Sequence, residues 1–376
     1  MESEMNTVLV TGSKGFIGKN LIISLSRMAD INVWGYDIDS PTAVMEEGLA
    51  KADAVYHLAG VNRPDHVDEF EKGNTELTQL VCRILRNRHK KPILVLSSSN
   101  QAAQDNPYGI SKRNSEKTVL EFGNETGAAV YVFRLPGVFG KWCRPNYNSV
   151  VATFCHNIAR DLPISISDPT RGIELIYIDD VVNGFTGILH GHPPATEGGF
   201  SRVAPTYRIT LGALAETLQG FRESRNNLLL PDMDDRFIRC LYATYLSYLP
   251  TDSFSYPLKQ FQDTRGELAE LLKSPHSGQF FVSRTRPGIM RGHHYHDTKV
   301  EKFVVIEGDA VIRFRSILGG DIIEYPVSGR EFRIVDIPPG YAHSIDNVGK
   351  TDLVVLFWAN EMFEPSHTDT YAMPVS

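Results

Sequence analysis

The chain has 376 residues, enough for two domains that each bury a core of their own. Hydrophobic residues make up 42% of it and charged residues 22%, which is typical of a soluble globular protein. The net charge of −7 argues against a nucleic-acid partner or a membrane surface, because both attract basic patches.

A glycine-rich loop near the start organises the first predicted domain. An apolar strand over residues 8–10 leads into glycines at GxxGxxG spacing, and an apolar periodic helix follows. Glycines let the backbone approach a pyrophosphate, and the helix N-terminus adds unpaired N–H groups and a favourable dipole. The loop therefore predicts nucleotide binding. The residues that we assign to the cofactor here are Gly12, Lys14, Gly15, Phe16, Ile17 and Gly18.

The next two strands indicate where the rest of the cofactor lies. The second strand ends at Asp37, whose carboxylate can accept both hydroxyls of an adenosine ribose and would repel a 2′-phosphate. Asp37 therefore favours NADH, whereas Lys14 could neutralise such a phosphate, so NADPH stays open. The third strand runs into Leu58, Ala59 and Gly60, where small residues let a cofactor cross the sheet edge.

A serine-ended strand and a YxxxK motif predict the catalytic groups. The strand over residues 92–96 delivers three serines to the carboxyl edge of the sheet, where ligands bind in this architecture. Tyr108 and Lys112 follow four residues apart, on one helical face. Lys112 can lower the phenol pKa and hold the nicotinamide ribose, while Tyr108 passes a proton to a carbonyl that receives hydride. A serine hydroxyl would hold the same carbonyl oxygen.

Together these motifs resemble the extended short-chain dehydrogenase/reductase superfamily over roughly residues 6–245. The matching segments are TGSKGFIG, HLAG, LSSS, YGISK and YIDDVV. The resemblance implies a Rossmann-type, doubly wound parallel α/β sheet, a nicotinamide cofactor, and catalysis by the last serine of the run, Ser99. Nucleotide-sugar members often carry an asparagine where this chain has Gly137. In the polar and aromatic stretch that follows, we assign Asn146 and Asn148 to substrate binding.

The pattern of predicted secondary structure changes in the last third of the chain. Helices are predicted over residues 210–222 and 236–246, and a stretch with two prolines then breaks the pattern. We place the boundary near Thr251, which gives domains of residues 1–250 and 251–376. Beyond it, short alternating strands punctuated by glycine predict an all-β barrel or jelly roll.

One segment of the second domain, GIMRGHHYHDTKVEKFVVIEG, carries its chemistry. His294 and His296 alternate along a strand, so both imidazoles face the same side. Glu301 follows five residues later, and His343 lies in the segment PPGYAHSIDN. Three imidazoles and a carboxylate inside a small barrel suit one borderline divalent ion. We therefore assign these four residues as metal ligands.

The spacing of these residues resembles the two motifs of the cupin superfamily. The matching positions are Gly288, His294, His296, Glu301 and Gly308, then Pro338, Gly340, His343 and Asn347, with Phe332 in place of an opening glycine. The segment DTRGELAEL, followed by RGHHYH, also resembles the nucleotide-sugar 3,5-epimerases of rhamnose synthesis, which need no metal. His294 is therefore a ligand or a base, and we choose the ligand.

The order of the two domains closely resembles the bifunctional capsular-polysaccharide and O-antigen enzymes that make a precursor of UDP-N-acetyl-L-fucosamine. The resemblance implies C3 epimerisation of UDP-2-acetamido-2,6-dideoxy-L-arabino-hex-4-ulose by the cupin domain. NAD(P)H-dependent C4 reduction by the first domain would then give UDP-2-acetamido-2,6-dideoxy-L-talose. The resemblance also implies a homodimer. We favour zinc over iron because ketone polarisation needs a Lewis acid and no redox change.

Two other functions stay open for the second domain. It could be a structural or dimerising module on a single-activity reductase. It could also be an oxygenase with a redox-active metal, because an HxH-E-H set also binds iron. Deuterium exchange at C3 distinguishes the epimerase from the structural module, and oxygen consumption would reveal the oxygenase.

The sequence also predicts the compartment. No apolar run approaches the length needed to cross a bilayer, and the acidic N-terminus lacks the profile of a signal peptide. The four cysteines have no paired or metal-type spacing, and none lies in the last 136 residues. We therefore expect a cytoplasmic protein without a disulfide framework.

Overall fold

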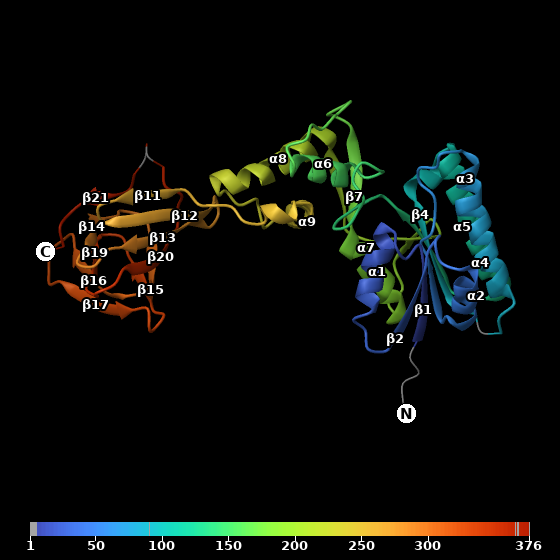
Figure 1. Ribbon diagram of the computed structural model, residues 1–376, viewed down its shortest axis with the longest axis horizontal. Helices are drawn as coiled ribbons and strands as arrows, with labels where there is room; N and C mark the ends of the chain where they lie inside the picture. Colours follow the sequence, from blue (N-terminus) through green and yellow to red (C-terminus); the bar gives the residue numbers. More distant parts are fainter. Residues whose placement is uncertain (1–5, 90, 365, 367, 376) are drawn as a thin grey trace. The chain divides into compact units, whose positions relative to one another are not determined.

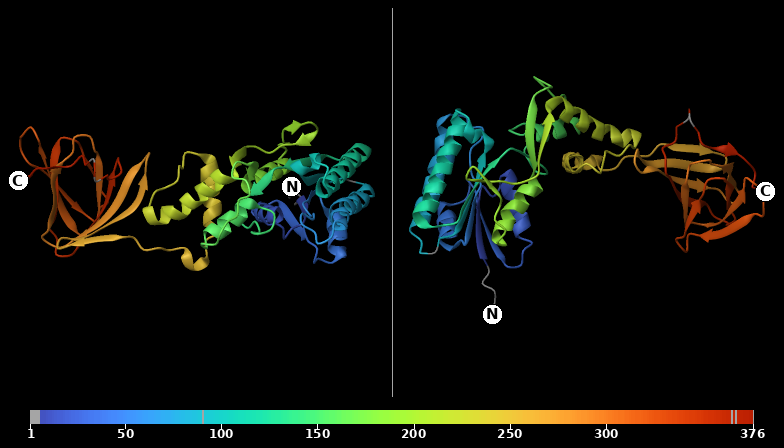
Figure 2. Two further views of the ribbon diagram at one scale, coloured as in Figure 1. Left: turned by 90° about the horizontal axis from the view of Figure 1, so that it is seen from above. Right: turned by 180° about the vertical axis from the view of Figure 1, so that it is seen from behind.

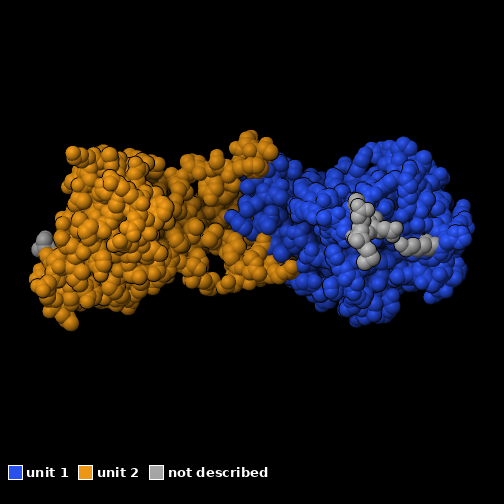
Figure 3. Space-filling model, turned by 90° about the horizontal axis from the view of Figure 1, so that it is seen from below, with its two compact units in different colours: residues 1–218, 240–249 blue, residues 219–239, 250–376 orange. Residues whose placement is uncertain are grey.

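The computed structural model describes residues 6–89, 91–364, 366 and 368–375 (Figure 1). It divides into two compact units, residues 1–218 with 240–249 and residues 219–239 with 250–376 (Figure 3). The dividing line passes through helices α8 (Leu211–Asn227) and α9 (Arg236–Leu246). The predicted boundary near Thr251 stays a prediction, because the unit that holds the barrel also takes in residues 219–239.

The first unit alternates strands with helices over most of its length. Its elements before α8 are β1 (Asn6–Thr11), α1 (Phe16–Leu25), β2 (Ile31–Tyr36), α2 (Thr42–Lys51), β3 (Ala54–His57), α3 (Asp68–Phe70), the π-helix η1 (Glu71–Glu76), α4 (Leu77–Arg86), β4 (Ile93–Ser99), the 3₁₀-helix η2 (Asn100–Ala103), α5 (Pro107–Thr126), β5 (Val130–Leu135), β6 (Gly137–Phe139), α6 (Val150–Ile158), β7 (Gly172–Tyr177), α7 (Ile178–Leu189), β8 (Thr196–Glu197), β9 (Phe200–Ser201) and β10 (Thr206–Thr210). Within the described residues, no helix combines the length and the apolarity needed to span a membrane.

A seven-stranded sheet with the order β2-β1-β3-β4-β5-β9-β8 forms the centre of this unit, and β10, β7 and β6 form a second, three-stranded sheet. The strands from β2 to β5 pair in parallel. The chain winds in opposite directions from β1, to β2 on one side and to β3 on the other. The carboxyl end of β1 is therefore the topological switch point at which ligands bind in such sheets.

Helices cover both faces of the large sheet, α1 and α7 on one and α2, α4 and α5 on the other (Figure 1). Buried residues of β1 alternate between the two cores. Val8 and Val10 pack with Phe185 on the α1/α7 side, whereas Leu9 packs with Phe122 on the opposite side. This burial on both faces explains why β1 reads as a continuous apolar run in the sequence.

The second unit contains an all-β barrel, which Figure 2 shows from two further sides. After the 3₁₀-helix η3 (Thr251–Ser253), its strands are β11 (Gln260–Asp263), β12 (Gly266–Ser274), β13 (Gly278–Thr285), β14 (Met290–Tyr295), β15 (Glu301–Glu307), β16 (Asp309–Ser316), β17 (Ile323–Ser328), β18 (Ile334–Ile337), β19 (Tyr341–Asn347), β20 (Leu353–Ala359) and β21 (Tyr371–Ala372). The sheet orders are β11-β12-β13-β20-β15-β18 and β17-β16-β19-β14-β21. The apolar core lies between them, with Phe303, Ile312 and Val355 among its buried residues.

An irregularity in β14 sets the position of the first predicted metal ligand. The pairing of β14 with β19 shifts register between Gly292 and His294, and Gly292 and His293 have φ angles of 101° and 61°. A Cβ atom on Gly292 would lie 2.7 Å from the carbonyl oxygen of His343, so the close approach requires glycine. The bulge places His294 directly opposite His343.

Candidate functional site

The glycine loop lies at the switch point, between the end of β1 and the start of α1. Gly12 has a φ angle of 69°, and a Cβ atom there would lie 2.7 Å from the backbone nitrogen of Ala59. A Cβ atom on Gly18 would lie 2.1 Å from the carbonyl oxygen of Gly12. Both positions therefore require glycine. Phe16, Ile17 and Gly18 form the first turn of α1, whose backbone N–H groups lack intrahelical acceptors.

Acidic residues after β2 contact this loop directly. The Asp37 carboxylate accepts a hydrogen bond of 2.7 Å from the backbone N–H of Lys14 and one of 2.9 Å from that of Ile38. The Lys14 ammonium is paired with Asp39, and both side chains are exposed. The structure thus brings together the two residues that we predicted to govern coenzyme choice, and it adds Asp39, which the sequence analysis missed.

The segment after β3 links the cofactor loop to the catalytic helix. Ala59 lies against Gly12, as described above, and its backbone N–H donates to the Thr11 hydroxyl at 3.3 Å. A Cβ atom on Gly60 would lie 2.7 Å from Asn74 Oδ1 and 3.8 Å from Lys112 Nζ. The predicted cofactor residues Leu58, Ala59 and Gly60 therefore lie between the glycine loop and Lys112.

The predicted catalytic residues lie together at the carboxyl end of β4. Tyr108 and Lys112 are on α5, and the Asn106 side chain caps this helix by accepting the N–H of Gly109 at 2.8 Å. The Ser99 hydroxyl lies close enough to the phenol of Tyr108 to lower its pKa, and it accepts the backbone N–H of Gln101 at 3.2 Å. Lys112 is buried, and its ammonium donates to the carbonyl oxygen of Ser97 at 2.7 Å.

The surroundings of Tyr108 and Lys112 shift both of their pKa values. Burial raises the pKa of Tyr108, and the neighbouring Ser99 hydroxyl partly offsets this effect. Burial lowers the pKa of Lys112 to about 8, although the Glu116 carboxylate favours its charged form. Tyr108 therefore keeps its proton at neutral pH, as a proton donor must.

The two serines at the end of β4 have different partners. Ser98 donates to Glu116 at 2.5 Å, and Glu116 also holds Arg134 of β5 through bonds of 2.9 and 2.7 Å. Ser98 thus belongs to a buried polar cluster, whereas Ser99 contacts Tyr108. The sequence analysis did not assign Glu116, although it lies four residues after Lys112 and so on the same helical face.

The predicted substrate residues lie on the segment between β6 and α6. Asn146 is exposed with a φ angle of 55°, and its backbone N–H donates to the Thr153 hydroxyl at 3.0 Å. Asn148 is also exposed. Exposed side chains are free to meet a ligand, so their substrate role stays a prediction.

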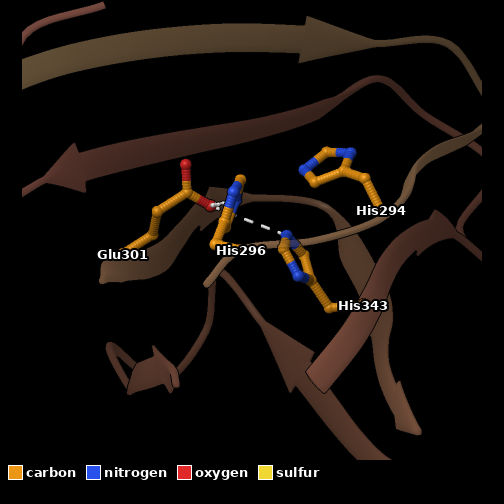
Figure 4. Close-up of side chains that lie close together, drawn as sticks. All are labelled: His294, His296, Glu301 and His343. Atoms are coloured by element: carbon orange, nitrogen blue, oxygen red, sulfur yellow. Dashed lines mark ion pairs between the residues drawn. The ribbon is translucent and has the colours of Figure 1, made fainter. Parts of the chain in front are cut away.

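Four side chains of the barrel converge on one point. His294, His296, Glu301 and His343 each offer one atom to a group in which all such atoms lie within 4.8 Å of one another. Glu301 Oε2 is 3.5 Å from His296 Nε2 and 3.6 Å from His343 Nε2. The ring centroids of His294 and His343 are 4.6 Å apart. Figure 4 shows the side chains, which come from β14, the residue after it, β15 and β19.

The polar atoms of this group are suited to a cation. Within the described part of the chain, the Nε2 atoms of His296 and His343 are buried and have no hydrogen-bond partner. Burial lowers the pKa of His294 to about 4, so its ring is neutral at neutral pH. Burial alone would raise the pKa of Glu301, but the two facing imidazoles hold it below its usual range. Three imidazoles and a carboxylate fit a zinc-like divalent ion.

Comparison with known proteins agrees with this arrangement. Residues 8–195 match the NAD dependent epimerase/dehydratase family, and residues 261–371 match the polysaccharide biosynthesis C-terminal domain. A protein of Pseudomonas aeruginosa, UDP-2-acetamido-2,6-beta-L-arabino-hexul-4-ose reductase, is 46% identical over 368 residues, which cover 98% of each chain. The chain belongs to the NAD dependent epimerase/dehydratase family. As a member of this family, it is an enzyme that uses a nicotinamide cofactor.

Solved structures confirm the predicted fold of this family member. The capsular polysaccharide assembling protein CapF from Staphylococcus aureus superposes with a TM-score of 0.92 at 46% identity, covering 98% of this chain and 100% of that one. A UDP-glucuronic acid 4-epimerase from Bacillus cereus has a TM-score of 0.50 and 18% identity over 57% of this chain and 83% of that one, which shows the fold alone. A Rossmann-type parallel sheet followed by a cupin-like barrel is therefore confirmed, as is the resemblance to the two-domain polysaccharide enzymes.

Proposed function

We propose that this enzyme epimerises C3 of UDP-2-acetamido-2,6-dideoxy-L-arabino-hex-4-ulose and then reduces its C4 ketone. The product is UDP-2-acetamido-2,6-dideoxy-L-talose, a precursor of UDP-N-acetyl-L-fucosamine for surface polysaccharide. The observation that carries this proposal is the 46% identity, over 98% of both chains, to a reductase named for that keto sugar.

The reduction uses the residues at the end of β4. A bound nicotinamide coenzyme would supply a hydride to C4 of the ketone, and Tyr108 would give its phenolic proton to the C4 oxygen, so that the ketone becomes an alcohol. Ser99 donates a hydrogen bond to the same oxygen. The Lys112 ammonium stabilises the phenolate that remains on Tyr108. The exposed Asn146 and Asn148 contact the nucleotide part of the substrate.

The coenzyme is NADH or NADPH, and charges at the end of β2 govern the choice. The Asp37 carboxylate lies where a ribose 2′ substituent is read in this fold, and negative charge there repels a phosphate. The Lys14 ammonium would attract a phosphate, but Asp39 competes for it. Steady-state kinetics with both coenzymes measure the preference for NADH or NADPH.

The epimerisation belongs to the barrel. We assign one divalent ion, zinc, to His294, His296, Glu301 and His343. The buried Nε2 atoms of His296 and His343, which have no hydrogen-bond partner among the described residues, support this assignment. A bound zinc ion acts as a Lewis acid that polarises a ketone and so acidifies the neighbouring C–H. The four side chains hold the ion, while the surrounding barrel excludes water from it.

The test uses the full-length protein and the keto sugar in D₂O without coenzyme. We expect deuterium at C3, detected by NMR, and we expect exchange to stop when a chelator removes the ion. Exchange that persists in folded, metal-free protein would instead favour a histidine base. No exchange in metal-replete protein would favour the alternative, a single-activity reductase with a structural or dimerising barrel. Oxygen uptake would reveal the oxygenase.

The proposal also includes a cytoplasmic location and a homodimer. Sedimentation of the purified protein measures the oligomeric state. A monomeric species at all concentrations would contradict the dimer without affecting the catalytic assignments.

A further inference from the structure

The C-terminal residues of the barrel run alongside the segment that carries two of the proposed ligands. Strand β21 pairs with β14, so that Ala372 lies opposite His294 and Tyr371 lies opposite Tyr295. The rings of Tyr295 and Tyr371 stack with centroids 5.2 Å apart. Beyond β21, the backbone N–H of Met373 donates to the carbonyl oxygen of His293 at 2.8 Å.

Asp369, just before β21, holds the loop that joins His296 to Glu301. Its carboxylate accepts the backbone N–H groups of Asp297, Thr298 and Lys299 at 2.9, 2.8 and 2.7 Å. It also accepts the Thr298 hydroxyl at 3.0 Å. Burial would raise the pKa of this carboxyl, but these donors outweigh burial and hold the pKa well below its usual range. One charged group therefore fixes three consecutive residues between two ligands.

The same residue also orients an imidazole. His296 Nδ1 forms a hydrogen bond with the carbonyl oxygen of Asp369, and a carbonyl can only accept, so Nδ1 carries the proton. The other ring nitrogen, Nε2, lies toward Glu301 and His343, where the proposed ion would bind. Thr370, the residue after Asp369, contacts the same loop. Its hydroxyl accepts a hydrogen bond of 3.3 Å from the Lys299 ammonium.

We infer that the C-terminal segment, residues 369–375, sets the geometry of the metal site, and that Asp369 is its main positioning residue. The inference rests on the proposed metal site. Partners that fix the tautomer and orientation of a ligating imidazole typically contribute about 10–100-fold to metal affinity. Asp369 acts on one ligand through its carbonyl and on the spacing of two ligands through its carboxylate.

The test is the zinc affinity of the full-length protein, measured by competition with a chromophoric chelator. Asp369→Asn keeps the carbonyl and the size of the side chain, but its amide N–H₂ group faces backbone donors. We expect zinc to bind about 10–100-fold more weakly than in the wild type. The matched control is Asp321→Asn, because Asp321 is exposed on the turn before β17, at the opposite edge of the same sheet. We expect its zinc affinity to be unchanged.

Amide hydrogen exchange gives a second readout that does not depend on metal. In metal-free Asp369→Asn, the amides of residues 297–299 should exchange faster while the core strands β16 and β19 keep their protection. If that variant does not fold, Thr370→Val tests the same segment more mildly and should also weaken zinc binding. Wild-type affinity in the folded variants overturns the inference alone. A wild-type protein that binds no divalent ion overturns the proposed metal site and this inference together.

Discussion

The reductase site and the barrel site satisfy their polar groups in opposite ways. Around Tyr108, the buried groups have protein partners, because Lys112 donates to a backbone carbonyl and Ser99 contacts the phenol. In the barrel, the buried Nε2 atoms of His296 and His343 have no hydrogen-bond partner among the described residues. Buried polar groups without partners are costly, so a fold retains them where a ligand completes them.

This difference predicts how each site responds to its missing component. The reductase site is already assembled, and it needs coenzyme and substrate but no further group to hold its residues in place. The barrel site holds three imidazoles and a carboxylate close together, an arrangement that a cation stabilises. Removal of metal should therefore destabilise the barrel, whereas removal of coenzyme should leave the first unit folded. The tests that follow separate the two sites.

The largest expected effect comes from Tyr108→Phe, which removes the proposed proton donor and keeps the ring against Phe70. Coenzyme oxidation should fall by about 10²–10⁴-fold, as is typical for the loss of a general acid. Deuterium exchange at C3 should stay at the wild-type rate, because that step belongs to the barrel, and it serves as the internal control. A variant that keeps most of its reductase rate would sink the assignment of Tyr108.

The paired serines offer a matched comparison within one strand. Ser99→Ala removes the hydrogen bond to the reacting oxygen and should lower kcat by about 10²–10³-fold, with little change in melting temperature. Ser98→Ala instead removes a buried bond to Glu116 and should cost about 1.5–3 kcal/mol of stability, with a smaller loss of kcat. Kinetics and thermal denaturation of both variants show which serine acts in catalysis and which one stabilises the fold. The reverse pattern would transfer the catalytic role to Ser98.

A ligand substitution tests the barrel. His343→Gln removes one imidazole of the group. It should weaken zinc binding by more than the roughly 10–100-fold that is typical when a residue that only orients a metal ligand is lost. Metal content after dialysis and the rate of C3 exchange are the measurements. His276→Gln is the control, because His276 is exposed on the turn between β12 and β13. Equal metal content in both variants would contradict the ligand assignment.

Much of both sites could be predicted from the sequence because their residues are close together in local motifs. The YGISK spacing placed Tyr108 and Lys112 on one face of α5, and the HxH spacing placed His294 beside His296. Contacts made by residues far apart in the chain could not be predicted in this way. The link between Asp369 and residues 297–299 spans about seventy residues, and the sequence carries no periodic signal for it.

The strand that carries His294 was predicted from the spacing of its histidines and not from hydrophobic alternation. Hydrophobic alternation is the usual sequence signal of a strand. The segment MRGHHY of β14 has little apolar alternation, because its inward side carries polar side chains and its backbone contains a bulge. A strand that builds a polar site loses the pattern by which strands are recognised.

The pH dependence of reduction tests the electrostatics around Lys112. The proposed mechanism needs a protonated Tyr108 and a charged Lys112, and both conditions fail as the pH rises. Because burial lowers the pKa of Lys112 to about 8, kcat/KM should be level below that pH and fall about tenfold per pH unit above it. Glu116→Gln removes the charge that favours the ammonium, so the fall should begin at lower pH. An unchanged profile in that variant would show that Glu116 does not act on Lys112.

The smallest effect should come from the exposed charges at the end of β2, and it sharpens the question of coenzyme choice. Asp39→Asn releases the Lys14 ammonium, which can then meet a 2′-phosphate, so KM for NADPH should fall while KM for NADH stays constant. Exposed ion pairs are weak, and we expect a shift of about two- to fivefold that shrinks with added salt. Asp37 is a poorer choice for this test, because its carboxylate also binds the backbone of the glycine loop and its loss would disturb both coenzymes. An unchanged ratio of the two KM values in Asp39→Asn, at low salt, would mean that Lys14 points away from the bound coenzyme.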